Sequence, residues 1–185
     1  MKFQTNDTPL DGLKLLTRPQ TKDARGQFSR LFCKDQLGEL GWPNGVAQSN
    51  LSVSHDVGTV RGLHFQHKPH SEAKLVTCIG GGVFDVAVDL RAGSSNFGKW
   101  YGVELNADNL FSLLIPVGFA HGFQALQPNS TMIYFHSTAY NSAAESGVRW
   151  DDKDLAIGWP IPVKNISARD MSLPPLAALG AGIQL

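Results

Sequence analysis

Short stretches rich in β-branched and aromatic residues dominate this chain, and they constrain its fold more than any other feature. Gly, Pro, Asn, Asp and Ser residues separate them at short, fairly regular intervals. Such spacing is typical of a β-sandwich or small barrel rather than of alternating strands and helices. We therefore predict an all-β fold of the jelly-roll type with few short helices. The predicted strands are residues 45–54, 59–66, 74–79, 82–91, 99–106, 110–116 and 130–138.

The rest of the chain is expected to add little regular structure. One short helix is predicted at residues 34–40, "KDQLGEL". A chain of 185 residues can bury a core without disulfide bonds. The almost uncharged tail at residues 173–185 is expected to pack on the body or on a second subunit. The prediction is thus a single domain over residues 1–185, with an N-terminal arm and this C-terminal tail.

Charge and cysteine content narrow the classes of function. Sixteen basic and sixteen acidic residues give a formal net charge of zero, which argues against a nucleic-acid or membrane binder with a strongly basic face. A small anionic ligand needs only a few local cations and is compatible with this balance. Cys33 and Cys78 form no metal or redox spacing, and free thiols fit a cytoplasmic location. The start of the sequence predicts no signal peptide, and no apolar run approaches the ~20 residues of a membrane span.

Polar residues able to carry chemistry gather in "RGLHFQHKPHSEAKL", residues 61–75. Successive side chains of a strand point to opposite faces. Leu63 and Phe65 should therefore share one face, while His64 and Gln66 share the other. The same period in neighbouring strands predicts that polar groups converge at one mouth of the barrel, where ligand sites commonly form.

The segment "VFDVAVDL" alternates in the same way, with an apolar face and a face that carries two aspartates. Asp85 is expected to support a site by hydrogen bonding. For Asp89 and for Lys99 in the next predicted strand, we expect a solvated outer face.

A metal site of the cupin type is one interpretation of the histidines. "IPVGFAHGF" carries the PxGxxH part of the cupin motif and ends in His121. The earlier HxH part fails, because Gln66 stands two positions after His64. His70 and Glu72, like the neighbouring His67, are expected to be solvated loop residues. A first-row metal requires three or four converging ligands, so no metal site is predicted.

Acid–base chemistry is the second interpretation. A histidine on a pocket face can move protons near neutral pH. Arg61 and Lys74 flank His64 in the same region, and Tyr134 interrupts an otherwise apolar strand. This set offers a base, cations for a developing oxyanion and a phenol for reprotonation.

Several segments, in the same order, resemble the dTDP-4-dehydrorhamnose 3,5-epimerases and related nucleotide-sugar epimerases. The resemblance runs from about Arg25 to Asp170, most of the chain. It implies a substrate that is a nucleotide-linked 4-keto-6-deoxyhexose, a homodimer with strands contributed across the interface, and no cofactor or metal. The segments are "RGLHFQ", "KLV…GGVFDVAVDLRAGSSNFGKW", "IPVGFAHGF", "GVRWDDKDLAIGWP" and "SARD".

The resemblance also implies catalytic roles. The C4 ketone acidifies the hydrogens on C3 and C5, and catalysis must stabilise the resulting enolate. His64 would be the base, with Asp170 of "SARD" orienting its ring and favouring its protonated form. Lys74 would stabilise charge on the C4 oxygen. Tyr134 would return a proton from the opposite face of the sugar, which inverts the centre.

Substrate contacts follow from the same resemblance. Arginines suit the diphosphate because the guanidinium fork matches phosphate oxygens. A polar pair in "AQSN" would surround the nucleotide, and a tyrosine would stack on the base or pack beside the sugar. The implied substrate-binding residues are Arg25, Gln48, Asn50, Arg61, His121, Tyr140, Glu145 and Arg169.

Two positions depart from the thymidine-binding pattern of the family. Arg30 stands where such members carry an acidic residue, and the expected aromatic pair is reduced to Ala139 and Tyr140. Both departures concern the nucleotide rather than proton transfer, so a different nucleotide is a hypothesis. Three alternatives remain open from the sequence: an epimerase that inverts only C3 or only C5, a metal-dependent cupin enzyme, and a non-catalytic sugar-nucleotide binding protein.

Overall fold

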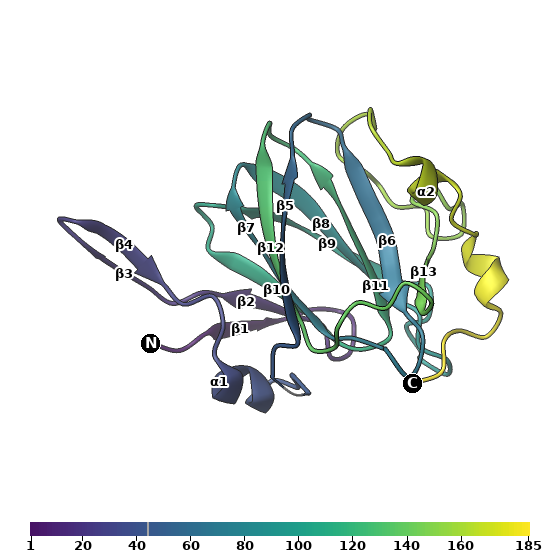
Figure 1. Cartoon of the computed structure of the whole chain (residues 1–185), viewed down its shortest axis with the longest axis horizontal. Helices are drawn as coiled ribbons and strands as arrows, with labels where there is room; N and C mark the ends of the chain where they lie inside the picture. Colours follow the sequence, from purple (N-terminus) through teal and green to yellow (C-terminus); the bar gives the residue numbers. More distant parts are fainter. Residues whose placement is uncertain (44) are drawn as a thin grey trace.

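The computed structural model describes residues 1–43 and 45–185, and within them two β-sheets pack face to face while a hairpin projects from the body (Figure 1). All strand pairs in these sheets are antiparallel. The six-stranded sheet consists, in spatial order, of β1 (Gln4–Asp7), β2 (Lys14–Thr17), β10 (Phe111–Ile115), β7 (Lys74–Gly80), β12 (Ser130–His136) and β5 (Gln48–Ser54). The five-stranded sheet consists of β13 (Glu145–Gly147), β6 (Val60–Gln66), β11 (Phe119–Ala125), β8 (Gly82–Asp89) and β9 (Trp100–Asn106).

The remaining elements are short. The hairpin is formed by β3 (Gln20–Asp23) and β4 (Gly26–Ser29). Two helices, α1 (Lys34–Glu39) and α2 (Ala168–Met171), and one 3₁₀ turn, η1 (Leu176–Leu179), complete the described secondary structure. The predicted all-β jelly-roll is confirmed, and so is the predicted helix at α1.

Each of the seven predicted strands is present, as β5 to β10 and β12. Six further strands were missed. Every residue of β11 is buried, so this strand lacks the alternation that marks a half-buried strand. In contrast, β1, β3 and β4 are only four residues long, and most of their residues are exposed, so their sequences carry little apolar signal.

Alternation along the strands builds three apolar layers. Between the sheets, residues such as Val76 on β7, Met132 on β12 and Phe123 on β11 form the central core. On the outer face of the five-stranded sheet, Leu63 and other alternate residues pack against the C-terminal segment, including Ile183. Figure 1 shows this yellow segment beside β6 and β13. A third cluster lies on the outer face of the six-stranded sheet under α1.

One expected surface residue is buried. Asp89 is 0% exposed, so the prediction of a solvated outer face was wrong for it. Its carboxylate accepts hydrogen bonds from Arg91 Nη2 at 2.6 Å and Ser94 Oγ at 2.7 Å. Lys99 is exposed, as expected. Sequence alternation placed Asp89 on a face but did not reveal the local arginine that makes its burial tolerable.

Two glycines bring β6 and β11 unusually close together beside the central core. A Cβ on Gly62 would lie 2.5 Å from Gly122 Cα and 2.7 Å from His121 O. The strands also change register between His121 and Phe123. Next to this close approach, His64 on β6 and His121 on β11 are paired opposite each other, so both imidazoles lie at the same end of the sandwich.

Candidate active site

A cavity of about 820 Å³ opens at the end of the sandwich, between the two sheets. Side chains of β5, β7 and β12 line it from one sheet, and side chains of β6, β11 and β13 from the other. The segment at residues 165–170 closes one side. Of the twelve predicted site residues, eleven line this cavity: Gln48, Asn50, Arg61, His64, Lys74, His121, Tyr134, Tyr140, Glu145, Arg169 and Asp170.

Strand register explains why several side chains of the six-stranded sheet line the cavity together. On β12, Tyr134 stands opposite Asn50 of β5, and His136 stands opposite both Gln48 of β5 and Lys74 of β7. These residues are two positions apart on their strands, so they project from one face. The predicted face of His64 and Gln66 on β6 also lines the cavity, as expected.

His64 and Asp170 form a hydrogen-bonded pair. His64 Nε2 lies 2.8 Å from Asp170 Oδ1, and Asp170 Oδ2 accepts the backbone N–H of Gly62 at 3.1 Å. Asp170 lies in the first turn of α2, where Ser167 Oγ accepts its backbone N–H. Ser167 is therefore the N-cap of this helix, and the Asp170 carboxylate pairs with His64 and Gly62 instead.

The electrostatics of this pair fix the histidine tautomer. Burial acts to raise the pKa of Asp170, but the hydrogen bond and charge of His64 and the Gly62 N–H outweigh it and hold the pKa at about 2. The carboxylate is thus ionised at neutral pH and can only accept. The 2.8 Å contact with this acceptor favours the tautomer of neutral His64 that carries its proton on Nε2. The 3.0 Å approach of Arg169 Nη2 to the same Nε2 is then a contact between two donors and not a hydrogen bond. In this tautomer Nδ1 keeps a free lone pair for a base.

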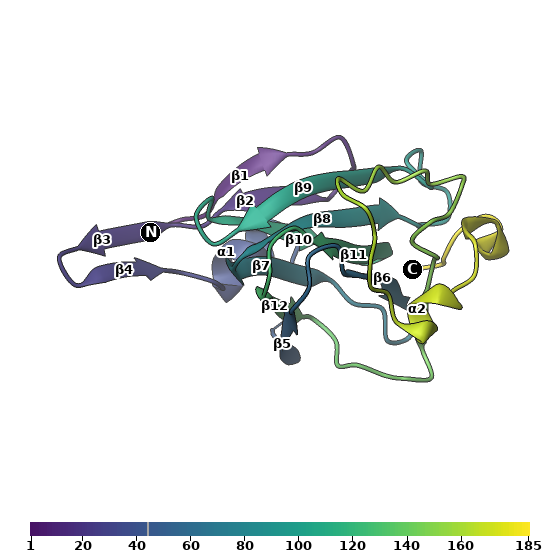
Figure 2. The same ribbon diagram turned by 90° about the horizontal axis from the view of Figure 1, so that it is seen from above.

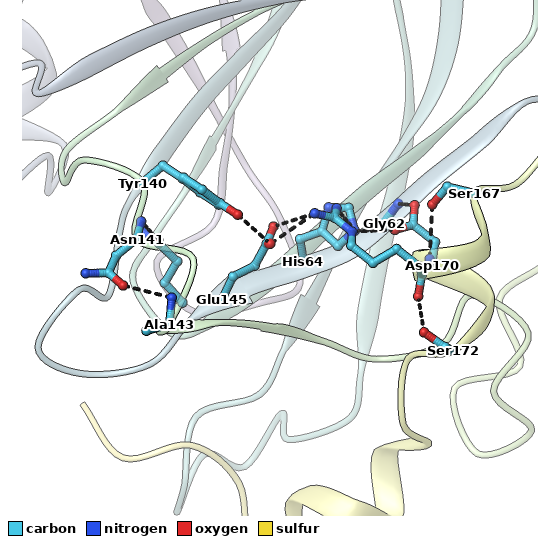
Figure 3. Close-up of polar contacts among 11 residues, drawn as sticks. Gly62, His64, Tyr140, Asn141, Ala143, Glu145, Ser167, Asp170 and Ser172 are labelled. Atoms are coloured by element: carbon cyan, nitrogen blue, oxygen red, sulfur yellow. Dashed lines mark hydrogen bonds and ion pairs between the residues drawn. The ribbon is translucent and has the colours of Figure 1, made fainter.

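A chain of polar contacts runs from this pair across the cavity mouth (Figure 3). Arg169 Nη2 lies 3.0 Å from His64 Nε2, and its Nε donates to Asp170 Oδ1 at 3.3 Å. Its Nη1 is 3.0 Å from Glu145 Oε2, which also accepts the phenol of Tyr140 at 2.9 Å. Figure 3 shows Tyr140, Glu145, His64 and Asp170 in one line. His64 is therefore linked through Arg169 and Glu145 to Tyr140 at the exposed rim of the cavity.

A second polar cluster surrounds Lys74. Its Nζ donates to His64 O at 2.9 Å and is 3.0 Å from Glu72 Oε1. Glu72 Oε2 lies 3.3 Å from His136 Nδ1 and accepts Gln66 Nε2 at 2.8 Å. The Glu72 side chain is only 8% exposed, so the prediction of a solvated loop residue was wrong. Partners on three strands hold its carboxylate inside the site.

Opposite this cluster, a second histidine is paired with a buried carboxylate. His121 Nε2 lies 2.8 Å from Asp85 Oδ1, so Asp85 supports the site as expected. The rings of His121 and Tyr134 meet edge to face, with centroids 6.0 Å apart. The Tyr134 hydroxyl is hydrogen-bonded to Ser52 Oγ at 3.1 Å. Burial raises the pKa of Tyr134, which keeps the phenol protonated at neutral pH.

The predicted nucleotide-side residues fall into two groups. Gln48 and Asn50 are joined by a hydrogen bond of 3.1 Å on β5, and Gln48 Oε1 accepts the backbone N–H of Tyr140. Arg61 Nε donates to Ser54 Oγ at 3.1 Å. Arg25 lies apart, at the end of the β3–β4 hairpin, and its guanidinium pairs with Asp23. Figure 2 shows the hairpin pointing away from the sheets.

Several cavity residues were not selected from the sequence. His136 follows Tyr134 at the two-residue spacing of one strand face, and this spacing could have identified it. Ser52 follows Asn50 in the same way on β5. Glu72 lies outside any strand and had no such signal. Among residues 1–43 and 45–185, no group of three His, Cys, Asp or Glu residues is arranged to hold a metal ion. No helix in the described chain is long and apolar enough to cross a membrane.

Comparison with known proteins agrees with this architecture. A family model described as dTDP-4-dehydrorhamnose 3,5-epimerase matches residues 7–178. An enzyme of that name from Mycobacterium tuberculosis is 45% identical over 178 residues, which cover 94% of this chain and 87% of the relative. A dTDP-4-dehydrorhamnose 3-epimerase from Streptomyces niveus is 41% identical over 176 residues, covering 94% and 84%.

A solved structure shows the same likeness in three dimensions. The dTDP-6-deoxy-D-glucose-3,5-epimerase of Legionella pneumophila, in complex with dTDP-4-keto-L-rhamnose, superimposes with a TM-score of 0.92 at 34% identity, and the match covers 99% of this chain and 98% of that one. This chain belongs to the dTDP-4-dehydrorhamnose 3,5-epimerase family.

Proposed function

We propose that the protein is an epimerase that inverts C3 and C5 of a dTDP-linked 4-keto-6-deoxyhexose. One observation carries the proposal: a histidine with a free Nδ1 lies on the five-stranded sheet, while a protonated phenol lies on the facing six-stranded sheet. A sugar between the sheets would meet His64 on one face and Tyr134 on the other. Inversion requires this arrangement, because a single base would only exchange a proton on one face.

The proposed reaction begins when His64 Nδ1 removes the hydrogen from the carbon beside the C4 ketone. The electron pair moves to the C4 oxygen and forms an enolate. Lys74, whose ammonium has two protein acceptors, keeps one N–H for this oxygen. One well-placed oxyanion donor contributes roughly 2.7–4 kcal/mol. Tyr134 then delivers its proton to the opposite face of the carbon, and both side chains exchange protons with solvent to return to their starting forms.

The charge on His64 is supported at the moment of reaction. As the imidazole gains a proton, Asp170 already faces its Nε2 at 2.8 Å. An ionised carboxylate at this distance stabilises the imidazolium and keeps the ring oriented. His121 and Asp85 lie beside Tyr134 on the opposite wall, where we propose that His121 contacts the substrate.

The remaining substrate contacts are proposed at the rim. Arg61 and Arg169 would bind the diphosphate, and Gln48, Asn50, Tyr140 and Glu145 would surround the nucleotide and sugar. Because the Arg25 hairpin projects from the body, we propose that it completes the cavity of a second subunit in a homodimer. The free thiols of Cys33 and Cys78 support a location in the reducing cytoplasm.

Proton NMR in D₂O would test the reaction. A dTDP-linked 4-keto-6-deoxyglucose is incubated with the protein, and the signals at C3 and C5 are followed. Loss of both signals, together with a new inverted product, is expected. Loss at C3 alone would instead make the protein resemble the 3-epimerase relative from Streptomyces niveus. If deuterium from the solvent replaces hydrogen at neither C3 nor C5, the proposal is contradicted.

The nucleotide is tested separately. Arg30 lies after β4, and its Nη1 donates to Met1 O at 3.0 Å. It is not among the residues that line the cavity of its own chain. If Arg30 replaces an acidic nucleotide contact, the preference for thymidine should be weak. Titration calorimetry with dTDP, UDP and GDP measures this, and a clear preference for dTDP would contradict the hypothesis of a different nucleotide.

A further inference from the structure

Glu72 is a buried carboxylate to which the proposed reaction assigns no task. It lies between β6 and β7 and lines the cavity. Its two oxygens have different partners. Oε1 lies 3.0 Å from Lys74 Nζ, while Oε2 accepts a hydrogen bond from Gln66 Nε2 at 2.8 Å and lies 3.3 Å from His136 Nδ1. A surface loop residue would not be held by three side chains in this way.

The orientation of Gln66 requires Glu72 Oε2 to be an acceptor. Gln66 Oε1 accepts the backbone N–H of Asn141 at 2.6 Å, and a backbone N–H can only donate. This contact fixes the amide flip, so Gln66 Nε2 must face Glu72. Lys74 is likewise only a donor. Both oxygens of Glu72 therefore meet obligatory donors, and an ionised carboxylate accepts from both.

Burial makes the negative charge of Glu72 matter to Lys74. The Lys74 side chain is 6% exposed, and a buried ammonium is unstable without a counter-charge. Burial also acts to raise the pKa of Glu72, but the His136 hydrogen bond and the charge of Lys74 keep that pKa below its ordinary value. The two groups thus maintain each other in the charged form.

We propose that Glu72 is a positioning residue that acts through Lys74. It keeps the ammonium charged inside the cavity and leaves one N–H directed at the reacting oxygen, while His136 and Gln66 hold the carboxylate in place. His136 in turn stacks on Tyr134, with ring centroids 6.1 Å apart. Glu72 therefore links the oxyanion donor to the wall that carries the proton donor. This inference rests on the proposed epimerase function.

The test variant is Glu72→Gln. Its amide can present oxygen to Lys74 or to Gln66, but the other donor then meets an NH₂ group. Without a counter-charge the ammonium should lose its proton more easily, so the basic limb of the kcat–pH profile should move to lower pH. At the pH of the wild-type optimum, kcat should fall by no more than the roughly 10²–10³-fold cost of losing one oxyanion donor, and KM should change far less. Glu39→Gln on α1, an exposed carboxylate outside the cavity, is the matched control.

The effect of Lys74 on the kcat–pH profile must be distinguished from the effects of other titratable groups nearby. Gln66 on β6 and Ile115 on β10, which stands opposite Lys74, do not titrate. A cycle that includes Lys74→Met isolates the contribution of the lysine, because the other groups are unchanged in all four proteins. Besides Glu72 and Lys74, the titratable groups that line the cavity are Arg61 and His64 on β6, His121 on β11, Tyr134 and His136 on β12, Tyr140, Glu145 on β13, and Arg169 and Asp170 on α2.

The cycle distinguishes the outcomes. If Glu72 acts through Lys74, Glu72→Gln should slow solvent exchange in the wild-type background but not in the Lys74→Met background. The double variant replaces a buried ion pair by neutral groups, which is often tolerated. Exchange in each of the four proteins is divided by its folded fraction, so poor folding of Glu72→Gln is not counted as a loss of activity. A uniform, additive loss at every pH, or a profile that coincides with the wild type, overturns the inference alone. Absence of exchange in the wild type overturns the proposed function and the inference with it.

Discussion

Replacing Asp170 by asparagine tests whether the carboxylate fixes the tautomer of His64. Asp170 Oδ1 faces His64 Nε2 at 2.8 Å, and Oδ2 accepts the Gly62 N–H at 3.1 Å. An asparagine of the same shape offers one oxygen and one NH₂ group. If the oxygen stays with His64, the NH₂ meets the N–H of Gly62, which can only donate. If the amide flips, its NH₂ donates to Nε2 and the proton of the imidazole moves to Nδ1.

The flipped amide satisfies Gly62 but removes the base. With the proton on Nδ1, the nitrogen without a protein partner has no lone pair to accept the substrate hydrogen. Asparagine in place of the aspartate of a serine-protease triad lowers kcat about 10⁴-fold for this reason. We expect a loss of that order in Asp170→Asn, with KM changed much less because the ring stays in place.

Stability should also depend on this carboxylate, with a defined sign. The pKa of Asp170 is lowered from 3.8 to about 2 in the folded protein, which corresponds to a stabilisation on the order of 2 kcal/mol. That contribution is present above the unfolded-state value near pH 4 and is lost as the pH falls through about 2. Asp170→Asn should therefore lower the free energy of unfolding at neutral pH, and the difference from wild type should shrink in acid.

The assay combines D₂O exchange of the 4-keto sugar nucleotide, followed by NMR, with urea unfolding at neutral and acidic pH. Asp151→Asn is the matched control, because Asp151 also pairs with one arginine, Arg149, but is exposed and outside the cavity. It should exchange like the wild type. A folded Asp170→Asn protein with near wild-type exchange would refute the tautomer argument. If the variant loses exchange only because part of it is unfolded, the exchange rate per folded molecule will equal that of the wild type.

Three further changes test other parts of the site. Tyr134→Phe should retain D₂O exchange at the centre served by His64 while it slows inversion; equal loss of both in the NMR assay would assign the phenol another role. Arg61→Gln should raise KM more than it lowers kcat, measured by initial rates, because Arg61 is expected to bind the diphosphate; a pure kcat effect would contradict this. Arg25→Ala should inactivate, and its co-expression with His64→Ala should restore activity in hybrid dimers. Failure of this complementation would mean that Arg25 does not act on a partner's site.

Much of the architecture was predictable because the strands of the sandwich alternate. The alternation in "RGLHFQ" placed His64 and Gln66 on the cavity face and Leu63 on the outer apolar layer. The same rule could not find β11, since all seven of its residues are buried. A strand at the centre of a sheet, covered on both faces, has no polar side to reveal it.

Two carboxylates that support cationic groups were not predicted as such. Glu72 and Asp89 were both predicted to be solvated, but each is buried beside a cation, Lys74 and Arg91 respectively. Their burial depends on partners that come together through chain turns and strand pairing. The sequence shows which residues are charged, and strand periodicity shows which face each one occupies. Whether a charged side chain is buried depends on neighbours from other parts of the chain, which the sequence alone does not locate.

The pattern of pairing also indicates how the substrate lies in the cavity. His64 faces Asp170, His121 faces Asp85, Lys74 faces Glu72 and Arg169 faces Glu145, so each of these basic groups already has a carboxylate. Among the described residues lining the cavity, Arg61 is the cation without one; its guanidinium donates only to Ser54 Oγ and Val53 O. A diphosphate gains most where its charge is not already balanced. We therefore propose that Arg61, near the end of β5, is the main contact of the diphosphate and that Arg169, already paired with Glu145, is a secondary one. The sugar would then lie between the paired basic groups and Tyr134.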